Sequence, residues 1–295
     1  MKKGLEMSDM QWVRSIYGAK PNGKKWYHYI PDKGINKVIA DWQNNNPDRE
    51  QSVASPSTLL SCPRALWLKK HNVKQTNPLG WGMKQRMMLG RVLENTIAQQ
   101  LADQGKLLWH WKDDNEGESE KFSIYKGTTS HFEGTPDLLL DLDDIPTISD
   151  SKTSRSDSYG FVPISSKEIW EDWGWYKYKL QVTAYYMLCH ANRDWFIDRD
   201  LPLPQQCHLF SYALDDGIVR REYTWKPTEA DKNAVIEYAI RYNSALDSVE
   251  CPDCTCHLSN DNFDVKFCRY GEVLEGDKVA TSCCDDLLIK EAKKG

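Results

Sequence analysis

The chain has 295 residues, 40% of them hydrophobic, and a formal net charge of −5 at pH 7. That apolar content suffices for one substantial core, so we expect one main domain with an appendage. The acidic balance argues against a protein that coats nucleic acid without sequence preference, because such proteins are usually basic. No apolar run approaches the roughly 20 residues that cross a bilayer, and residues 1–26 have no signal-peptide core. We therefore expect a soluble protein of the cytoplasm with no membrane partner.

The first half of the chain predicts a polar arm followed by two helices. Residues 1–54 are polar and rich in turn signals, which is typical of an arm. A helix is predicted to begin after Ser55 and to carry Cys62. A second helix is predicted over 84–104, where Glu94 and Ile97 share one face with other apolar positions. Glu94 therefore lies within an apolar stripe.

The middle of the chain predicts strands. Strand-like stretches cover 107–111, 122–125, 135–142 and 147–153, and the last two read as an antiparallel hairpin that turns at Asp143 and Asp144. A strand has a side-chain period of two, so Ile148, Asp150 and Lys152 share one side of the second hairpin strand. The later elements expected are a helix over 178–190, strands over 207–213 and 218–225, and a helix over 229–246.

Three acidic residues and a lysine occupy positions that a single metal-dependent catalytic site would explain together. An unpaired charge on a buried helix face costs several kcal/mol, so Glu94 is hard to dismiss as incidental. Asp137 heads an apolar strand, and Asp150 lies on its predicted partner. Magnesium takes oxygen ligands, so these three carboxylates are candidate metal ligands. Lys152 would orient a metal-bound water or offset charge on a scissile phosphate. Taken singly, Asp150 and Lys152 could also form a solvated strand face, and Asp137 could be a turn residue.

These residues resemble the split signature of the PD-(D/E)xK nucleases, which include RecB-type nucleases, CRISPR-associated adaptation nucleases and phage lambda-type exonucleases. The resemblance consists of Gly134-Thr135-Pro136-Asp137 followed by Asp150-Ser151-Lys152, with Glu94 on a preceding helix. RecB-like members follow the lysine with a Gln-x-x-x-Tyr helix, which here is Gln181 to Tyr185. Spacing by four places this Gln and Tyr on one helical face. RecB-like members often have His where this chain has Glu94, whereas lambda-type exonucleases have an acid there.

The resemblance implies an α/β fold with a restriction-endonuclease-like core, a central mixed sheet flanked by helices, and a cysteine-rich C-terminal cap. It divides the chain into an arm (1–54), a nuclease core (55–250) and a C-terminal segment (251–295) that packs back on the Cys62 helix. It implies hydrolysis of DNA with Mg²⁺ or Mn²⁺ as cofactor. The DNA would be single-stranded or have free ends, in recombination, repair or phage DNA processing. A homo-oligomer or a recombination partner protein, and a host cytoplasm if the chain is of phage origin, are also compatible.

Nine cysteines in a chain without an export signal predict metal or cluster ligation, because the cytosol keeps thiols reduced. The iron-sulfur branch of the same family takes one ligand before the nuclease core and three after it. That resemblance makes Cys62, Cys251, Cys254 and Cys268 candidate ligands of a 4Fe-4S cluster. Zinc is the alternative, and Cys62 could instead be a small buried hydrophobe. Further ligand candidates are Cys256, His257, Cys283 and Cys284. Cys189 and Cys207 are expected in the core.

Basic and aromatic residues near the expected site are candidates for contact with nucleic acid. The basic candidates are phosphate contacts in principle, although each alone is equally a surface charge. Trp173 and Trp175 lie in an aromatic stretch that could stack single-stranded bases or fill a core. The basic candidates are Arg64, Arg86, Arg91 and Arg155.

Two other functions are compatible with the same residues. A catalytically inactive nucleic-acid-binding module would keep the fold without the chemistry, although the intact Lys152 and three acids argue against it. A zinc-stabilised interaction protein would use the cysteines alone. Iron with acid-labile sulfide would disfavour this second alternative.

Overall fold

The structure is a computed structural model that describes residues 53–73, 81–111, 121–124, 131–154, 173–213 and 219–252, with residues 35, 37, 38, 41, 272–273 and 279–280. The chain forms two compact units. One comprises Gln51–Lys70 and Leu93–Thr255, and the other comprises Met1–Glu50, His71–Val92 and Cys256–Gly295. The first of these units contains the central sheet. The expected division into an arm, a nuclease core over 55–250 and a C-terminal segment stays a prediction.

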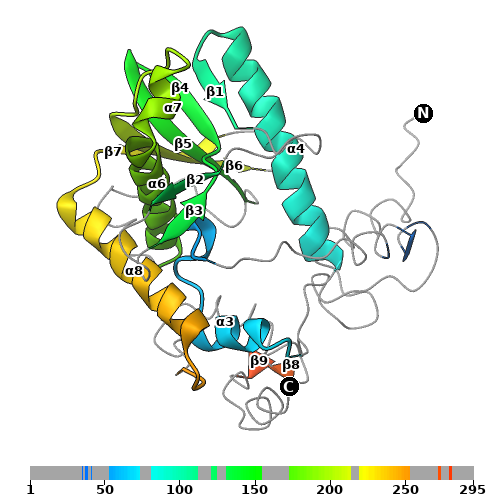
Figure 1. The fold of residues 1–295 in the computed structure, drawn as a ribbon. Coiled ribbons are helices and arrows are strands. Elements are labelled where there is room, and N and C mark those ends of the chain that lie inside the picture. The colour runs from blue at the N-terminus through cyan, green and yellow to red at the C-terminus, as the bar shows by residue number, and fades with distance from the viewer. Residues whose placement is uncertain are drawn as a thin grey trace, which may run out of the picture. The chain divides into compact units, whose positions relative to one another are not determined.

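A five-stranded mixed sheet forms the centre of the first unit (Figure 1). Its strand order is β1-β4-β5-β6-β7. Every neighbouring pair is antiparallel except β5 and β6, which run parallel in the register Asp150↔Leu209. The strands are β1 (Leu107–His110), β4 (Leu138–Leu142), β5 (Ile145–Ser154), β6 (Gln206–Ala213) and β7 (Val219–Trp225). A separate pair comprises β2 (Phe122–Ile124) and β3 (Phe132–Gly134), and the second unit contains β8 (Glu272–Val273) and β9 (Val279–Ala280).

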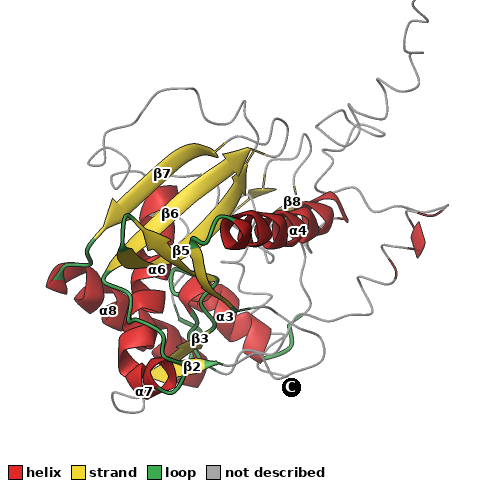
Figure 2. Ribbon diagram, turned by 90° about the horizontal axis from the view of Figure 1, so that it is seen from above, coloured by secondary structure: helices red, strands yellow, loops and turns green. Residues whose placement is uncertain are grey.

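Helices flank the sheet, as Figure 2 shows for α6 and α8. The helices are η3 (Pro56–Thr58), α3 (Pro63–Lys70), α4 (Trp81–Asp103), α6 (Trp173–Ala191), α7 (Arg193–Ile197) and α8 (Glu229–Asp247). α6 packs against β5 and β6, and α8 packs against α6 and α3. Together with the sheet they give the expected α/β class with helices around a mixed sheet. Among the described residues, no helix is both long enough and apolar enough to span a bilayer.

The two faces of the sheet carry different cores because strand side chains alternate. Leu139, Ile148 and Leu209 point into the main core, which also contains Leu180 and Leu188 of α6. Leu138, Leu140 and Phe210 point into a smaller core with Ile97 and Ala98 of α4. Ile97 and Leu101 therefore lie on a buried helix face, as the spacing predicts. All four of these strand leucines are at most 1% exposed.

The β4–β5 hairpin confirms the central sequence prediction. Leu138 pairs with Ser149, and the turn uses Asp143 and Asp144 with φ of 53° and 62°. Asp and Asn adopt this left-handed region more readily than most residues, which suits them to a two-residue hairpin turn. The expected strand over 135–142 is shorter, because β4 begins at Leu138 and residues 135–137 are not in a strand. Pro136 has no N–H for a ladder hydrogen bond, which accounts for the interruption.

Prolines and aromatic packing shift two helix starts from the expected positions. α3 begins at Pro63, which suits a first helical turn, so Cys62 precedes the helix rather than lying inside it. α6 begins at Trp173, five residues before the predicted start at Tyr178. Burial of Trp175 against the main core outweighs the modest helix propensity of aromatic residues. The short elements β3 and α7 were not predicted.

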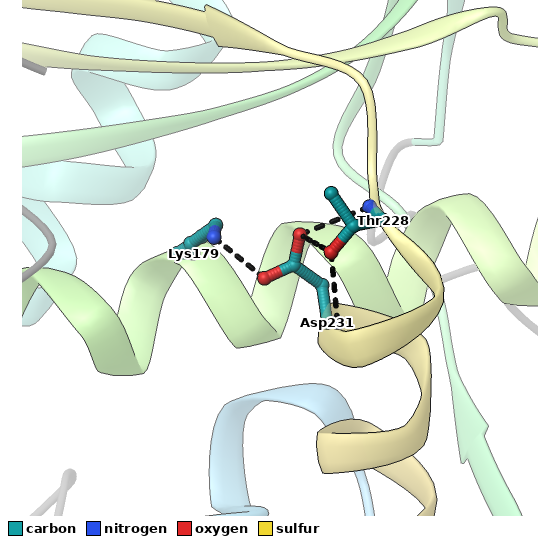
Figure 3. Close-up of polar contacts among 3 residues, drawn as sticks. All are labelled: Lys179, Thr228 and Asp231. Carbon is teal, nitrogen blue, oxygen red and sulfur yellow. Dashed lines mark hydrogen bonds and ion pairs between the residues drawn. The ribbon is translucent and has the colours of Figure 1, made fainter. Parts of the chain in front are cut away.

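A buried ion pair fixes the start of α8 against α6 (Figure 3). Lys179 Nζ lies 2.5 Å from Asp231 Oδ1, with the two side chains 15% and 10% exposed. The other carboxylate oxygen, Oδ2, accepts hydrogen bonds from Thr228 N at 3.0 Å and Thr228 Oγ1 at 2.8 Å. Thr228 Oγ1 in turn accepts from Asp231 N, which completes a capping box. Burial would raise the pKa of Asp231, but the hydrogen bonds from Lys179 and Thr228 lower it.

Lys179→Met is expected to destabilise the protein by about 1–2 kcal/mol, because Asp231 would keep its burial but lose its cation. Urea unfolding monitored by circular dichroism measures the change. Lys232→Met is the matched control, since Lys232 pairs with Glu229 at 2.7 Å while those side chains are 30% and 82% exposed. Its expected cost is under about 0.5 kcal/mol. Equal costs for the two variants would contradict this assignment.

Candidate active site

Asp137 and Asp150 face each other at one end of the β4–β5 hairpin. Asp137 directly precedes β4, and the pairing of Leu138 with Ser149 places it opposite Asp150. Alongside burial, the charge of Asp150 acts on Asp137 and helps to raise its pKa. Asp150 is 1% exposed and Asp137 is partly buried. Two neighbouring carboxyl groups that are largely away from water are a costly arrangement unless a proton or a cation lies between them.

The electrostatics of Asp137 follow from that arrangement. Burial, Asp150 and Glu94 raise the pKa of Asp137 well above its ordinary value, and Lys152 opposes them. Asp137 therefore tends to retain a proton that an isolated aspartate would lose. A divalent cation bound between the two carboxylates would offset their negative charge, so that the proton is no longer retained. The donor set is hard oxygen, which suits Mg²⁺ or Mn²⁺.

Lys152 points to the same carboxylate from two residues along β5. Its Nζ lies 2.6 Å from Asp150 Oδ2 and 2.9 Å from Oδ1, and its side chain is 22% exposed. Burial alone would lower the pKa of Lys152, but Asp150 and Asp137 raise it above the ordinary value. The ammonium therefore keeps its charge at neutral pH. The shared strand face of Asp150 and Lys152 is as the sequence predicts.

Gln181 and Tyr185 project from α6 toward these acids. Gln181 Nε2 donates to Tyr185 Oη at 3.1 Å, and both residues are buried, at 6% exposed each. Burial, followed by the charges of Asp137 and Asp150, raises the pKa of Tyr185 well above its ordinary value. The phenol therefore stays protonated and remains a hydrogen-bond donor near the carboxyl pair. The one-turn spacing predicted from sequence places both side chains as expected.

Glu94 lies at the margin of this group. Its charge reaches Asp137, but its Oε1 is 3.9 Å from His110 Nε2, and its side chain is 25% exposed. In the described part of the chain, no three His, Cys, Asp or Glu side chains are arranged to hold a metal ion as they stand. The carboxyl pair is thus assembled, whereas the role of Glu94 as a third ligand stays a prediction. Sequence reasoning missed His110, which β1 carries beside Leu138.

A hydrogen-bonded chain crosses the sheet on the opposite face of β5. Ser149 Oγ and His208 Nδ1 are 2.8 Å apart, and His208 Nε2 is 3.0 Å from Glu222 Oε1. Ser149 and His208 are buried, whereas the Glu222 side chain is 63% exposed. The hydrogen bond from His208 lowers the pKa of Glu222. These hydrogen bonds connect Ser149, the residue next to Asp150, to β6 and β7. No spacing in the sequence indicated them.

Gly134 leads into the segment that carries Asp137. A Cβ at this position would lie 2.6 Å and 2.8 Å from the ring carbons Cδ and Cγ of Pro56. A proline ring has little freedom to move away, so only glycine fits without displacement. The glycine of the Gly-Thr-Pro-Asp sequence therefore permits close approach of η3 to the loop before β4.

The segment around Cys62 contacts the residues that follow α8. Trp67 Nε1 donates to Ser248 O at 3.0 Å, and Arg64 Nε donates to Pro252 O at 2.8 Å. The Cys62 and Cys251 side chains are both partly buried. Cys254 and Cys268 lie outside the described residues, as do Cys256, His257, Cys283 and Cys284. Cys189 and Cys207 are fully buried core residues, and burial raises the pKa of each thiol.

The candidate nucleic-acid contacts divide into four groups. Arg64 Nε donates to the backbone carbonyl of Pro252, and its role as a phosphate contact stays a prediction. Trp175 is 4% exposed and packs against Tyr178 and Tyr223, so its ring has no open face for a base. It belongs to the core, which was the alternative interpretation. Arg91 is exposed on α4. Arg155 and the side chains of Arg86 and Trp173 lie outside the described residues.

Comparison with known proteins adds little to this description. No family model matches the chain, and no curated protein matches it. Among solved structures, one titled "Crystal structure of SSO0001" superposes with a TM-score of 0.42 at 16% sequence identity. The match covers 78% of this chain and 89% of that chain. This similarity is too low to support a conclusion about this chain. The fold therefore follows from the strand order of this chain, and the site follows from the contacts of its residues.

Proposed function

We propose that this protein is a divalent-metal-dependent deoxyribonuclease. The observation that carries the proposal is the buried Asp137–Asp150 pair with the Lys152 ammonium 2.6 Å from Asp150. Burying this much like charge at the end of a hairpin costs stability, and such costs are concentrated at functional sites. A purely structural role would be served better by apolar residues of similar size.

The residues fit a hard divalent cation, whose bound form would supply an activated water and neutralise charge on the phosphate. Asp137 and Asp150 would hold Mg²⁺ or Mn²⁺, with Glu94 as a third oxygen donor. Lys152 keeps its proton and can orient a water or stabilise charge that develops on a phosphate oxygen. Tyr185 stays protonated and can donate a hydrogen bond into the same space. Gln181 holds the Tyr185 hydroxyl in position.

The order of these residues along the chain supports placing the protein among the PD-(D/E)xK nucleases, with a restriction-endonuclease-like core. Glu94 on a helix, then Asp137, Asp150 and Lys152 on a hairpin, then Gln181 and Tyr185 on a helix, form the series of that family. On this basis the substrate is DNA that is single-stranded or has free ends, and the reaction is exonucleolytic. Recombination, repair or phage DNA processing in a cytoplasm is the corresponding setting.

We further propose a 4Fe-4S cluster that ties the two ends of the nuclease core together. The supporting observation is that the residues after Cys62 and the residues around Cys251 are joined by the Arg64–Pro252 and Trp67–Ser248 hydrogen bonds. Cys62 and Cys251 are partly buried in this joined region, which suits a cluster shielded from solvent. Cys254 and Cys268 would complete the ligand set and the cysteine-rich cap. Zinc bound by the same thiols is the alternative, and metal analysis with acid-labile sulfide separates the two.

The test is incubation of the purified protein with end-labelled single-stranded, linear double-stranded and closed circular DNA, with Mg²⁺, Mn²⁺ or EDTA. We expect cation-dependent loss of substrates with ends and little cleavage of the closed circle. Lys152→Ala should abolish cleavage, whereas Lys106→Ala should not, because Lys106 pairs with Asp141 at 3.7 Å near the other end of the hairpin. DNA binding without cleavage by the unaltered protein would favour the inactive binding module. Neither binding nor cleavage, together with bound zinc, would favour the interaction protein.

A further inference from the structure

An aromatic ring faces the candidate catalytic lysine from α6. Lys152 Nζ lies 4.9 Å from the centroid of the Tyr178 ring. That distance is within the roughly 6 Å over which an ammonium is attracted to the face of an aromatic ring. The ammonium thus has two anchors, the Asp150 carboxylate on its own strand and the Tyr178 ring on the helix.

Tyr178 belongs to the same helical face as the two other site residues of α6. Positions 178, 181 and 185 are separated by three and four residues, so Tyr178, Gln181 and Tyr185 lie in one row along the helix. The charges of Asp137 and Asp150 act on Tyr185, Gln181 donates to the Tyr185 hydroxyl, and the Tyr178 ring lies near the lysine. One helix therefore carries side chains that serve both the carboxyl pair and the ammonium.

The ring packs against Trp175 of the same helix, which is held in turn by two residues of a third element. Trp175 meets Tyr178 edge-on, with ring centroids 5.9 Å apart and an interplanar angle of 77°. Trp175 is in turn packed by Tyr223, at 5.9 Å between centroids, and by Arg221, whose Cζ is 5.2 Å from the ring. Both residues belong to β7. The side chains behind Tyr178 leave its ring little freedom to turn away from Lys152.

A bound cation would change what holds the lysine in place. Asp150 is a proposed metal ligand, so its oxygens would be shared between the cation and Lys152. An ammonium on a flexible four-carbon stem then needs a second contact to keep one position, and an uncharged ring provides it without competing for the cation. A misplacement of about 1 Å in a reacting group costs up to about a hundredfold in rate.

We infer that Tyr178 is the positioning residue for Lys152, holding its ammonium over the aromatic ring at the site proposed above. The inference rests on the proposed function and adds to it a residue that the family signature does not contain. The chemically relevant part of Tyr178 is the ring face rather than the hydroxyl. A phenylalanine should therefore serve in its place, and an aliphatic residue should not.

The test compares Tyr178→Leu and Tyr178→Phe in steady-state cleavage of end-labelled DNA with Mg²⁺. We expect Tyr178→Leu to lower kcat about tenfold to a hundredfold with little change in KM, and Tyr178→Phe to restore kcat to within about threefold of the unaltered enzyme. Tyr176→Leu is the matched control, because Tyr176 is a partly buried aromatic of the same helix that does not contact Lys152. An unchanged kcat in Tyr178→Leu, alongside loss of cleavage in Lys152→Ala, would overturn the inference.

A second measurement separates this inference from the proposed function. The side-chain ¹³Cε–¹H resonance of Lys152, identified by its loss in Lys152→Ala, should be shifted upfield by the ring current in the unaltered protein and in Tyr178→Phe. The shift should vanish in Tyr178→Leu. If the protein does not cleave DNA but shows this pattern, the proposed function fails and the contact stands. Absence of the shift in the unaltered protein overturns the inference, whether or not Tyr178→Leu folds.

Discussion

Asp150→Asn is expected to lower cation-dependent DNA cleavage by at least about a thousandfold. Asn has nearly the same shape as Asp but no charge, so it would weaken cation binding and release the Lys152 ammonium from its 2.6 Å contact. Two elements of the site would be lost with one substitution. Initial rates at several Mg²⁺ concentrations measure the effect, and a higher cation requirement should accompany the lower maximal rate.

Asp141→Asn is the matched control for this prediction. Asp141 lies on the neighbouring strand β4, pairs with Pro146, and contacts Lys106 at 3.7 Å with the two side chains 28% and 46% exposed. It is an aspartate of the same hairpin with a lysine partner, but without a second carboxyl group. Its replacement should leave cleavage almost unchanged. Similar rates for the Asp150→Asn and Asp141→Asn variants would remove Asp150 from the mechanism.

Asp137→Asn is expected to stabilise the cation-free protein while abolishing activity. The folded-state pKa of Asp137 is raised by burial, Asp150 and Glu94. The stability associated with such a group is complete below its unfolded-state pKa of about 3.9 and is lost as the pH rises through the folded-state value. Asn carries no proton to lose. The expected gain at neutral pH is about 1–2 kcal/mol, or about 2–8 °C in Tm.

Divalent cations should make the unaltered protein more stable than the Asp137→Asn variant. A cation that binds only the folded state at a hundred times its Kd stabilises it by about 2.7 kcal/mol. The free energy of unfolding of the unaltered protein should rise by this amount when the cation is present. The rise should be larger at higher pH, because the cation then has to displace a proton from fewer molecules. The Asp137→Asn variant should gain little. Thermal unfolding with EDTA and with Mn²⁺ between pH 5 and 8 measures both effects. If the Asp137→Asn variant is less stable than the unaltered protein with EDTA at every pH, the carboxyl pair is not under electrostatic strain.

The local parts of the fold follow from the sequence. The β4–β5 hairpin was predicted because two strand-like stretches flank a turn at Asp143 and Asp144, and both aspartates adopt the left-handed conformation. The α8 helix follows from Thr228 and Asp231, whose spacing of three is that of a capping box. The site residues Asp150 and Lys152 share a face because residues two apart in a strand point to the same side of the sheet. These features depend on neighbours within a few residues of each other.

What depends on distant packing could not be predicted from the sequence. The strand expected over 135–142 included Pro136, whereas β4 begins after it, and the pairing of β2 with β3 depends on contacts between separate segments. The burial of Trp175 was undecided in sequence, because an aromatic residue suits both a base-stacking surface and a core. The parallel register of β5 and β6 brings His208 beside Ser149, and the two positions are 59 residues apart.

The sequence by itself determined which side chains could carry chemistry, because motif order and the periods of strand and helix are local properties. Only the tertiary structure decided that Asp137 lies opposite Asp150, that Lys152 lies over the Tyr178 ring, and that Glu94 sits beside His110. These contacts join two strands, the residue before β4 and two helices. Their free energies depend on burial and on a few ångströms of separation, and both are set by how the elements pack.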